Sequence, residues 1–213
     1  MNLNSLAIVG AGGHARSIFS WLSSSNVNFN NLYFVDKYKK KEDEKIFNHA
    51  IIQKDWNCID QINIDAYLIA IGDNDLREQL FNLLIKKDKK IVDLIHNSAI
   101  LGIGSKLGRS IAIGPLCIVG PLVVLKDNII VNSGAIIEHE SIIGSHSHIA
   151  PGAKIAGRVI MGNNVFLGIG AIIKENIVIG NNVIIGAGAV VINDVPSNSV
   201  VAGVPAKLIR KLD

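Results

Sequence analysis

The 213-residue chain is poor in cysteine, aromatic residues and charge. Two cysteines, Cys58 and Cys117, are too few for a disulfide framework and lack metal-ligand spacing. Charged residues form only 18% of the chain against 49% hydrophobic residues, which excludes a disordered protein. The uncharged stretch 110–125 is too short to span a bilayer, and no basic segment of a signal peptide precedes the first apolar run. We therefore expect a soluble, cytoplasmic protein without a membrane span.

Residue usage changes sharply near residue 95. Ten of the eleven aromatic residues precede that position, whereas sixteen of the twenty glycines follow it. The charges of residues 1–94 sum to zero, and residues 95–213 carry the whole net charge of +3. Neither half has the basic surface that nucleic-acid binding requires. The sequence therefore predicts two domains, 1–94 and 95–213, and no nucleic-acid partner.

The second half repeats with a period of six. Counted from Ile95 to Val191, all seventeen residues in the first column are aliphatic or methionine, and the second column is glycine nine times. The fifth column holds only small or aliphatic residues, including Cys117. A strict period of six fits neither an α-helix nor an ordinary strand, but it fits a parallel β-helix built from hexapeptides. Its first and fifth columns would fill the interior, so Cys117 is expected in the core.

The first half alternates strands and helices, which predicts a small Rossmann-like α/β domain with a parallel sheet. Strands are expected at 5–9, 32–35 and 66–71, with helices after residue 13 and from about 76 to 86. The turn Gly10-Ala11-Gly12-Gly13-His14 follows the first strand, and Asp36 ends the second. Such a turn presents backbone N–H groups to a phosphate, with an acid placed for a ribose. A tight turn that needs glycine for its φ angle would leave the same pattern.

The repeat contains one polar cluster, Glu138-His139-Glu140 followed by His146-Ser147-His148. The carboxylates beside His139 could orient its imidazole and raise its basicity. His139 and His148 are nine residues apart, which is half of an eighteen-residue coil, so they face different sides of the prism. Both can serve one site only if that site lies between neighbouring subunits. Self-association is therefore a condition of any mechanism that uses both.

These features together resemble the hexapeptide-repeat sugar acetyltransferases with an N-terminal Rossmann-like domain. The resemblance rests on the hexads, the His139-Glu140 pair, the start Ile-Val-Gly-Ala-Gly-Gly-His, the segment 69–74 and the tail Ala-Gly-Val-Pro-Ala-Lys at 202–207. It implies a homotrimer of left-handed β-helices with active sites between subunits. It also implies an N-acetyltransferase that uses acetyl-CoA, without a metal, on the 4-amino group of a UDP- or dTDP-linked amino-dideoxy sugar for surface-glycan biosynthesis.

The same resemblance assigns roles to residues. His139 matches the general base and Glu140 its supporting carboxylate, whereas His148 matches the histidine that contacts the acetyl group from the adjoining subunit. The remaining matches are Gly157, Ile169 and Ala187 for the CoA arm, Asn132 near the reacting centre, and Gly12, Gly13, His14, Asp36 and Gly72 for the nucleotide sugar. Some members carry two acids after the second strand where this chain has Asp36-Lys37, so Lys37 bears on which base is bound.

Residue chemistry agrees with this assignment and leaves alternatives open. A histidine can take the proton of a sugar amine, which then attacks the thioester directly without an acyl-enzyme. Lys207 and Arg210 could meet CoA phosphates or simply lie at the surface. The alternatives are sialic acid O-acetylation in the same family, a zinc hydratase of the γ-carbonic-anhydrase kind using His139, His146 and His148, and a nucleotide sensor on a trimerising stalk.

Overall fold

The computed structural model describes residues 2–25, 27–38 and 44–212. The chain forms two compact units, Met1–Leu94 and Ile95–Asp213. No helix in the described part of the chain combines the length and the apolar character that crossing a membrane would require.

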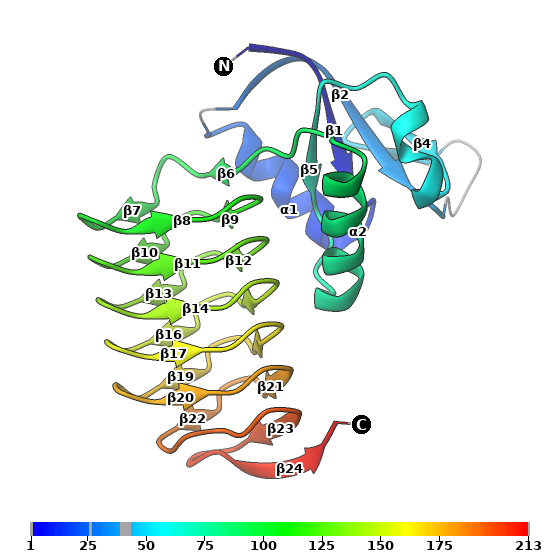
Figure 1. Ribbon diagram of the computed structural model, residues 1–213. Helices are drawn as coiled ribbons and strands as arrows, with labels where there is room; N and C mark the ends of the chain where they lie inside the picture. The colour runs from blue at the N-terminus through cyan, green and yellow to red at the C-terminus, as the bar shows by residue number, and fades with distance from the viewer. Residues whose placement is uncertain (1, 26, 39–43, 213) are drawn as a thin grey trace. The chain divides into compact units, whose positions relative to one another are not determined.

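The first unit is a five-stranded sheet of order β3-β4-β2-β1-β5 (Figure 1). Its strands are β1 (Asn2–Val9), β2 (Asn28–Asp36), β3 (Lys45–Ile46), β4 (His49–Gln53) and β5 (Ala66–Ile69). Its helices are α1 (Gly13–Leu22), the 3-10 helix η1 (Trp56–Gln61) and α2 (Asn74–Lys86). Strands β1, β2, β4 and β5 pair in parallel, and only β3 runs antiparallel to its neighbour β4.

Alternating side chains of the central strands pack against different helices. Ala7 and Val9 of β1 share a buried cluster with Leu80 and Leu84 of α2. Val35 of β2 belongs to the same cluster. Phe34, the residue before it, instead meets α1, where the ring centroids of Phe34 and Phe19 are 5.7 Å apart. The predicted strands and helices are present; β1 and β2 are longer than expected, and β5 ends at Ile69 instead of residue 71. The hairpin β3–β4 and the helix η1 were not predicted.

The second unit is a left-handed β-helix with three faces (Figure 1). The first face contains β7 (Ile100–Leu101), β10 (Ile118–Val119), β13 (Ile136–Ile137), β16 (Lys154–Ile155), β19 (Ile172–Ile173) and β22 (Val190–Val191). The second contains β8 (Lys106–Leu107), β11 (Val124–Leu125), β14 (Ile142–Ile143), β17 (Ile160–Met161) and β20 (Val178–Ile179). The third contains β6 (Leu94–Ile95), β9 (Ala112–Ile113), β12 (Ile130–Val131), β15 (His148–Ile149), β18 (Phe166–Leu167), β21 (Val183–Ile185), β23 (Ser199–Ala202) and β24 (Lys207–Lys211).

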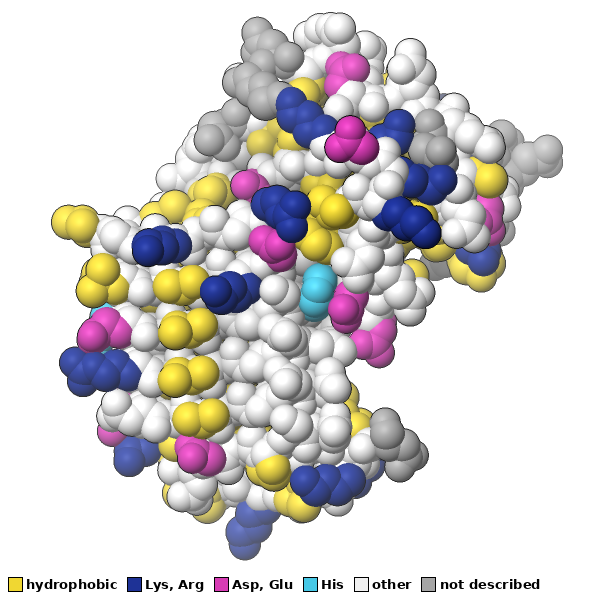
Figure 2. Space-filling view, viewed as in Figure 1, with side chains coloured by type: hydrophobic (Ala, Val, Ile, Leu, Met, Phe, Trp, Pro, Cys, Tyr) yellow, Lys and Arg dark blue, Asp and Glu magenta, His cyan; other side chains and the backbone are white. Residues whose placement is uncertain are grey.

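The period of six places each column of residues on one side of the coil wall. From Ile111 onward, the apolar side chains of the first and fifth columns form one continuous buried cluster, as predicted, and Cys117 is part of it; in the first coil, Leu101 is 40% exposed. On the second face, the residues before the first column lie outside, and Figure 2 shows a row of hydrophobic side chains there, where Ile142, Ile160 and Val178 are exposed; on the third face, Ile130 and His148 at the same column are buried. The antiparallel strand β24 pairs with β23 and ends the third sheet.

The glycines of the repeat have two different physical causes. A Cβ added to a second-column glycine would collide with the next coil, as at Gly144, where it would lie 2.3 Å from the backbone of Gly162. The fourth column instead has positive φ at every coil from Gly104 to Gly188. That column accepts asparagine, leucine, glutamate, histidine and arginine as well as glycine, because one left-handed residue costs only about 1–2 kcal/mol.

The three turns between faces differ in their side chains. We name them by the faces that they join: the 1–2 corner, the 2–3 corner and the 3–1 corner. At the 2–3 corner, side chains cap the preceding coil, since Asp127 accepts from the N–H of Arg109 and Asn163 accepts from the N–H of Ser145. The corners therefore carry separate residue sets, and these sets decide where a site can form.

Candidate active site

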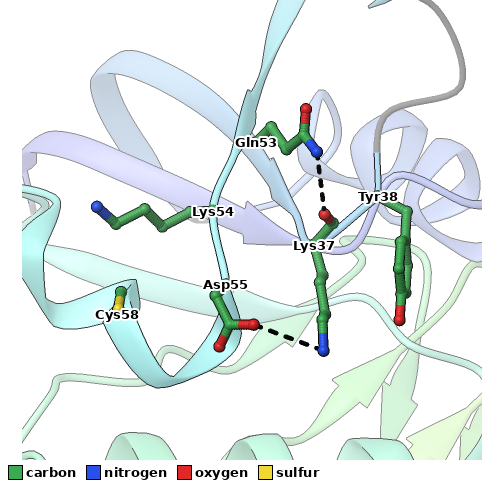
Figure 3. A pocket seen from close by; sticks show the side chains of 6 residues that line it. All are labelled: Lys37, Tyr38, Gln53, Lys54, Asp55 and Cys58. Carbon is green, nitrogen blue, oxygen red and sulfur yellow. Dashed lines mark hydrogen bonds and ion pairs between the residues drawn. The ribbon is translucent and has the colours of Figure 1, made fainter.

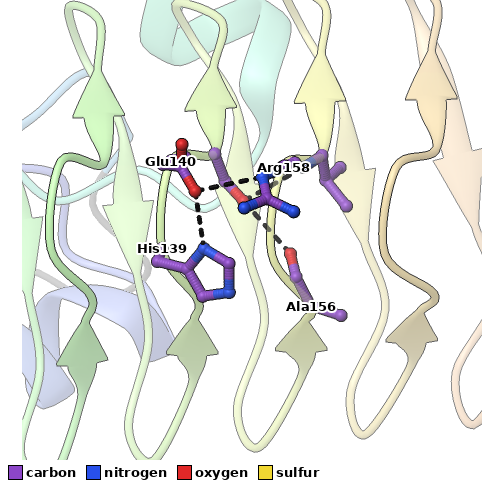
Figure 4. Close-up of polar contacts among 6 residues, drawn as sticks. His139, Glu140, Ala156 and Arg158 are labelled. Carbon is purple, nitrogen blue, oxygen red and sulfur yellow. Dashed lines mark hydrogen bonds and ion pairs between the residues drawn. The ribbon is translucent and has the colours of Figure 1, made fainter.

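His139 and Glu140 lie at the 1–2 corner, directly after β13 (Figure 4). His139 Nδ1 and Glu140 Oε2 are 3.0 Å apart, and the two side chains are 45% and 44% exposed. With Nδ1–H donating to the carboxylate, Nε2 keeps its lone pair for accepting a proton. The hydrogen bond from His139, followed by the charge of Arg158, lowers the pKa of Glu140, so this carboxylate is ionised at neutral pH.

The next coil of the prism holds this pair in place (Figure 4). Arg158 Nε lies 3.0 Å from the same oxygen, Glu140 Oε2, and the backbone N–H of Arg158 donates to the carbonyl of His139 at 2.9 Å. The imidazole lies over Gly157, where an added Cβ would come within 2.5 Å of His139 Nε2. A side chain at position 157 would therefore displace the His139 ring from this position.

His148 and Asn132 form a second group on the third face. His148 is a buried residue of β15, and its ring meets the edge of Phe166 with centroids 5.3 Å apart. Asn132 Nδ2 lies 3.3 Å from His148 Nε2, and Asn132 Oδ1 accepts from the N–H of Ser133. Since the amide Nδ2 can only donate, Nε2 is the acceptor in this contact.

The two histidine groups belong to different parts of the prism. His139 and Glu140 follow a strand of the first face, whereas His148 lies on a strand of the third. Ile169 and Ala187 are exposed at the 3–1 corner, 18 residues and one coil apart. One chain therefore gathers His139, Glu140 and Gly157 at one corner, and places His148, Ile169 and Ala187 elsewhere. A site that combines both sets would need a second copy of the chain, and it remains a prediction.

The 3–1 corner is unusual in its fourth column. From the third coil onward, four successive coils have glycine in that column: Gly134, Gly152, Gly170 and Gly188. A Cβ added to any of them would meet no other atom of the chain within 4 Å. At the other two corners the same φ carries Asn164, Asn182, Glu140 and Arg158. Backbone conformation therefore does not explain the glycines of the 3–1 corner, and neither does packing within the chain.

The glycines of the N-terminal turn also divide into two kinds. Gly10 has φ +114°, and an added Cβ would lie 2.7 Å from Ile71 Cδ1, so its glycine is required by the fold. Gly12 and Gly13 have open space where a Cβ would lie. Gly12 is the N-cap of α1 and has no side chain that could cap the first N–H groups of the helix. The start of α1 therefore presents backbone N–H groups of the kind that bind anions.

Asp36 and Lys37 end β2 beside this turn. Asp36 accepts from the N–H of Ala11 at 2.7 Å and from that of Tyr38 at 3.0 Å, so the acid ties the turn to the strand end. Lys37 Nζ lies 3.5 Å from Asp55 Oδ2 at the mouth of an open pocket of about 580 Å³ (Figure 3). The pocket is lined by Lys37, Tyr38, Gln53, Lys54, Asp55 and Cys58.

Gly72 lies next to His14, since a Cβ added to Gly72 would be 3.9 Å from His14 Cβ. The buried guanidinium of Arg77 holds this loop: it donates to the carbonyls of Ile71 and Gly72 at 3.3 Å and to Asn74 Oδ1 at 2.7 Å. Burial, and then the charge of Arg77, lower the pKa of His14 to about 4. At neutral pH His14 is therefore an uncharged imidazole.

Comparison with known proteins agrees with both units. Residues 5–84 match the PglD N-terminal domain family, and residues 158–193 match the bacterial transferase hexapeptide family of six repeats. The acetyltransferase domain of PglB from Neisseria gonorrhoeae FA1090, solved with acetyl coenzyme A, is 26% identical, with a TM-score of 0.89 over 97% of this chain and 99% of that one. PerB from Caulobacter crescentus, solved with CoA and GDP-perosamine, is 29% identical, with a TM-score of 0.87 over 97% of both chains.

The chain belongs to the hexapeptide-repeat sugar acetyltransferases. The resemblance seen in the sequence is thus confirmed, and with it the fold of both domains and the class of enzyme. In this acetyltransferase, Lys207 and Arg210 lie exposed on β24. No group of three potential metal ligands was found among the residues that the structure describes.

Sequence analysis missed two residues that contact the candidate site residues. Arg158 follows Glu140 by 18 residues, which is one coil, so its position could have been found by adding the coil length to the predicted carboxylate. Arg77 left no such signal, because a single arginine in a helix with an exposed side looks the same whether its guanidinium is buried or solvated.

The low pKa of His14 predicts a loss of stability in mild acid. The folded pKa of about 4 lies below the unfolded value of 6.5, so the contribution of neutral His14 is complete above pH 6.5 and is lost as the pH falls toward 4. The full loss amounts to about 3 kcal/mol at most. Urea unfolding at pH 7, 6 and 5 measures it, and the His14→Gln variant should lose less stability over that range. Equal losses in both proteins would contradict the prediction.

Proposed function

We propose that this acetyltransferase moves the acetyl group of acetyl-CoA to the 4-amino group of a nucleotide-linked amino-dideoxy sugar, with His139 as general base. The observation that carries the proposal is the contact of His139 Nδ1 with Glu140, which leaves Nε2 of this half-exposed side chain to take a proton. PerB, the relative with 29% identity, was solved with a nucleotide-linked amino sugar, which supports this class of acceptor.

The proposed reaction needs no acyl-enzyme. His139 Nε2 takes a proton from the sugar amine while the nitrogen attacks the thioester carbonyl, forming a C–N bond and an oxyanion. When the oxyanion collapses, the C–S bond breaks and the imidazolium returns the proton to the CoA thiolate. Cys117 is unsuited to be a nucleophile, because burial raises the pKa of its thiol to about 11 and the thiol donates to the carbonyl of Asn132.

A homotrimer would complete the site. His139 and Glu140 at the 1–2 corner of one subunit would face His148, Asn132, Ile169 and Ala187 of the next. The first face lies between the 1–2 and 3–1 corners, so a cyclic assembly that joins these corners turns the first face toward its axis. Exposed leucines support contact there, since Leu122 at the 1–2 corner is 58% exposed and Leu116 at the 3–1 corner is 72% exposed.

The glycines of the 3–1 corner suit a binding place for the CoA arm. Their Cβ positions are open, so a bound chain could lie close to the backbone there. The neighbouring residues carry no charge in the segments 151–153, 169–170 and 187–188. Ile169 and Ala187, which match the CoA contacts of the family, precede two of these glycines. Gly157 would contribute from the 1–2 corner, where it also makes room for the His139 ring.

The N-terminal domain would hold the nucleotide end of the acceptor. The open start of α1 at Gly12 and Gly13 suits a diphosphate, with neutral His14 and the loop at Gly72 beside it. Asp36 and Lys37 would lie toward the ribose and the base. We place this reaction in the cytoplasm, where acetyl-CoA is available.

An acceptor panel tests the proposed function. Acetyl-CoA consumption would be followed with UDP-, dTDP- and GDP-linked 4-amino sugars, each beside its 4-hydroxy counterpart, and with free sialic acid. We expect turnover with at least one nucleotide-linked amino sugar and none with its 4-hydroxy counterpart. Activity on sialic acid alone would replace the proposal with O-acetylation, and activity on none of these compounds would overturn both.

A further inference from the structure

The carboxylate beside His139 has a second partner that the reaction scheme does not use. Glu140 Oε2 accepts from His139 Nδ1 and from Arg158 Nε, both at 3.0 Å (Figure 4). One oxygen thus joins a base on one coil to a cation on the next. Arg158 is itself fixed near the base, because its backbone N–H donates to the carbonyl of His139.

Glu140 needs such a partner to stay in place. Its side chain is 44% exposed, and the residue has φ +59°, so few neighbouring atoms restrict its rotamers. A guanidinium donates from a planar nitrogen in a fixed direction, whereas an ammonium acts as a mobile point charge. A freely rotating Glu140 would leave the His139 ring without the contact that fixes which nitrogen carries the proton.

We propose that Arg158 is a positioning residue, which holds the Glu140 carboxylate on His139 Nδ1 so that Nε2 faces the acceptor amine. The proposal rests on the proposed role of His139 as general base. It assigns to Arg158 an effect on the turnover number through Glu140, and none on the binding of either substrate.

The charge of Arg158 gives this role a second, independent signature. A nearby cation opposes the uptake of a proton at the site, so Arg158→Leu and Arg158→Lys should differ in the acid limb of the rate profile, because only the lysine variant keeps the charge. The other charged groups near His139 are Glu138 and Glu140 on its own coil and, beyond Gly157, the pair Lys174–Glu175 on the next.

A double-mutant cycle over Arg158 and Glu140 tests the proposal. Arg158→Leu should lower kcat about fivefold, the upper value for an exposed charged pair, with both KM values within about twofold. In the Glu140→Gln background the same change should cost less than about twofold, because Arg158 acts through the carboxylate. Arg158→Lys keeps the charge, so it should leave the acid limb in place while lowering kcat.

Arg109→Leu is the matched control. Arg109 pairs with Asp127 at 2.9 Å, also across 18 residues, but at the 2–3 corner. This variant should keep the kcat and the acid limb of the wild-type enzyme. The oligomeric state of each variant is measured beside its kinetics, and if Arg158→Leu fails to assemble, Arg158→Gln and Arg158→Lys complete the cycle.

Two outcomes would overturn the role of Arg158: wild-type kcat and pH profile in Arg158→Leu, or equal losses in the wild-type and Glu140→Gln backgrounds. Failure of the proposed function has a different signature. If His139→Ala retains activity, the base itself is wrong. If His139→Ala is inactive and Arg158→Leu behaves as wild type, only the positioning role is wrong.

Discussion

Replacing His139 with alanine is expected to lower kcat about 10²–10⁴-fold, the range for loss of a general base. The side chain lies half-exposed at a corner and is hydrogen-bonded to Glu140 on the surface, so the fold should survive. Affinity for the nucleotide-linked sugar should be unchanged, because the nucleotide end would bind in the N-terminal domain. Steady-state kinetics with acetyl-CoA, together with a binding titration of the sugar, measure both quantities.

The control for this variant is chemical rescue. The alanine leaves open space above Gly157, since the ring that occupied it is gone. Added imidazole should therefore restore part of the lost activity, and more of it as the pH rises and the free base becomes dominant. A His139→Ala variant that turns over at the wild-type rate would remove His139 from the mechanism. If His139→Ala does not assemble, Glu140→Gln is measured instead, and wild-type turnover in that variant would count against the pair.

Replacing Gly170 with asparagine is expected to raise the KM for acetyl-CoA by roughly 10- to 100-fold, which corresponds to about 1.4–2.8 kcal/mol of lost binding. The residue has φ +66° and meets no atom of its own chain at the Cβ position, so asparagine should be accepted by the fold. The new side chain would occupy the surface on which the CoA arm is proposed to lie. The KM for the amino sugar should stay the same.

The matched control exchanges the same two residues at another corner. Asn182 has φ +55° at the 2–3 corner, and its side chain donates to Asn198. Asn182→Gly should leave the KM for acetyl-CoA unchanged and lower thermal stability slightly. An unchanged KM in Gly170→Asn would show that the CoA arm lies away from the 3–1 corner.

The sequence predicted the β-helix well because every coil repeats the same hexapeptide pattern of inward-facing residues. The first and fifth columns face the interior at nearly every hexapeptide, and a single chain shows the aliphatic first column seventeen times. The hairpin β3–β4 was missed for the opposite reason. Its turn uses Phe47 and Asn48 at positive φ, where the usual glycine signal is absent.

The candidate site was predicted only where its residues are neighbours in sequence. His139 and Glu140 are adjacent, and the contact between them is the one that the sequence suggested. Gly157 lies under the His139 ring and Arg158 contacts Glu140, both from the next coil. The pKa of His14 is lowered first by burial and then by the charge of Arg77, which comes from a helix far along the chain. Such long-range contacts depend on which residues a fold brings together, and a single sequence does not display them.

The order of residues alone was enough to determine the coil length, the inward columns, the two domains and the pairing of a histidine with a carboxylate, since each of these follows from spacing along the chain. The tertiary structure decided which glycines are needed for packing and which leave a surface open. It also placed the guanidinium of Arg158 against Glu140, the carboxylate that contacts the proposed base. Those features arise from atoms on successive coils approaching within a few ångströms, and only the folded backbone sets such distances.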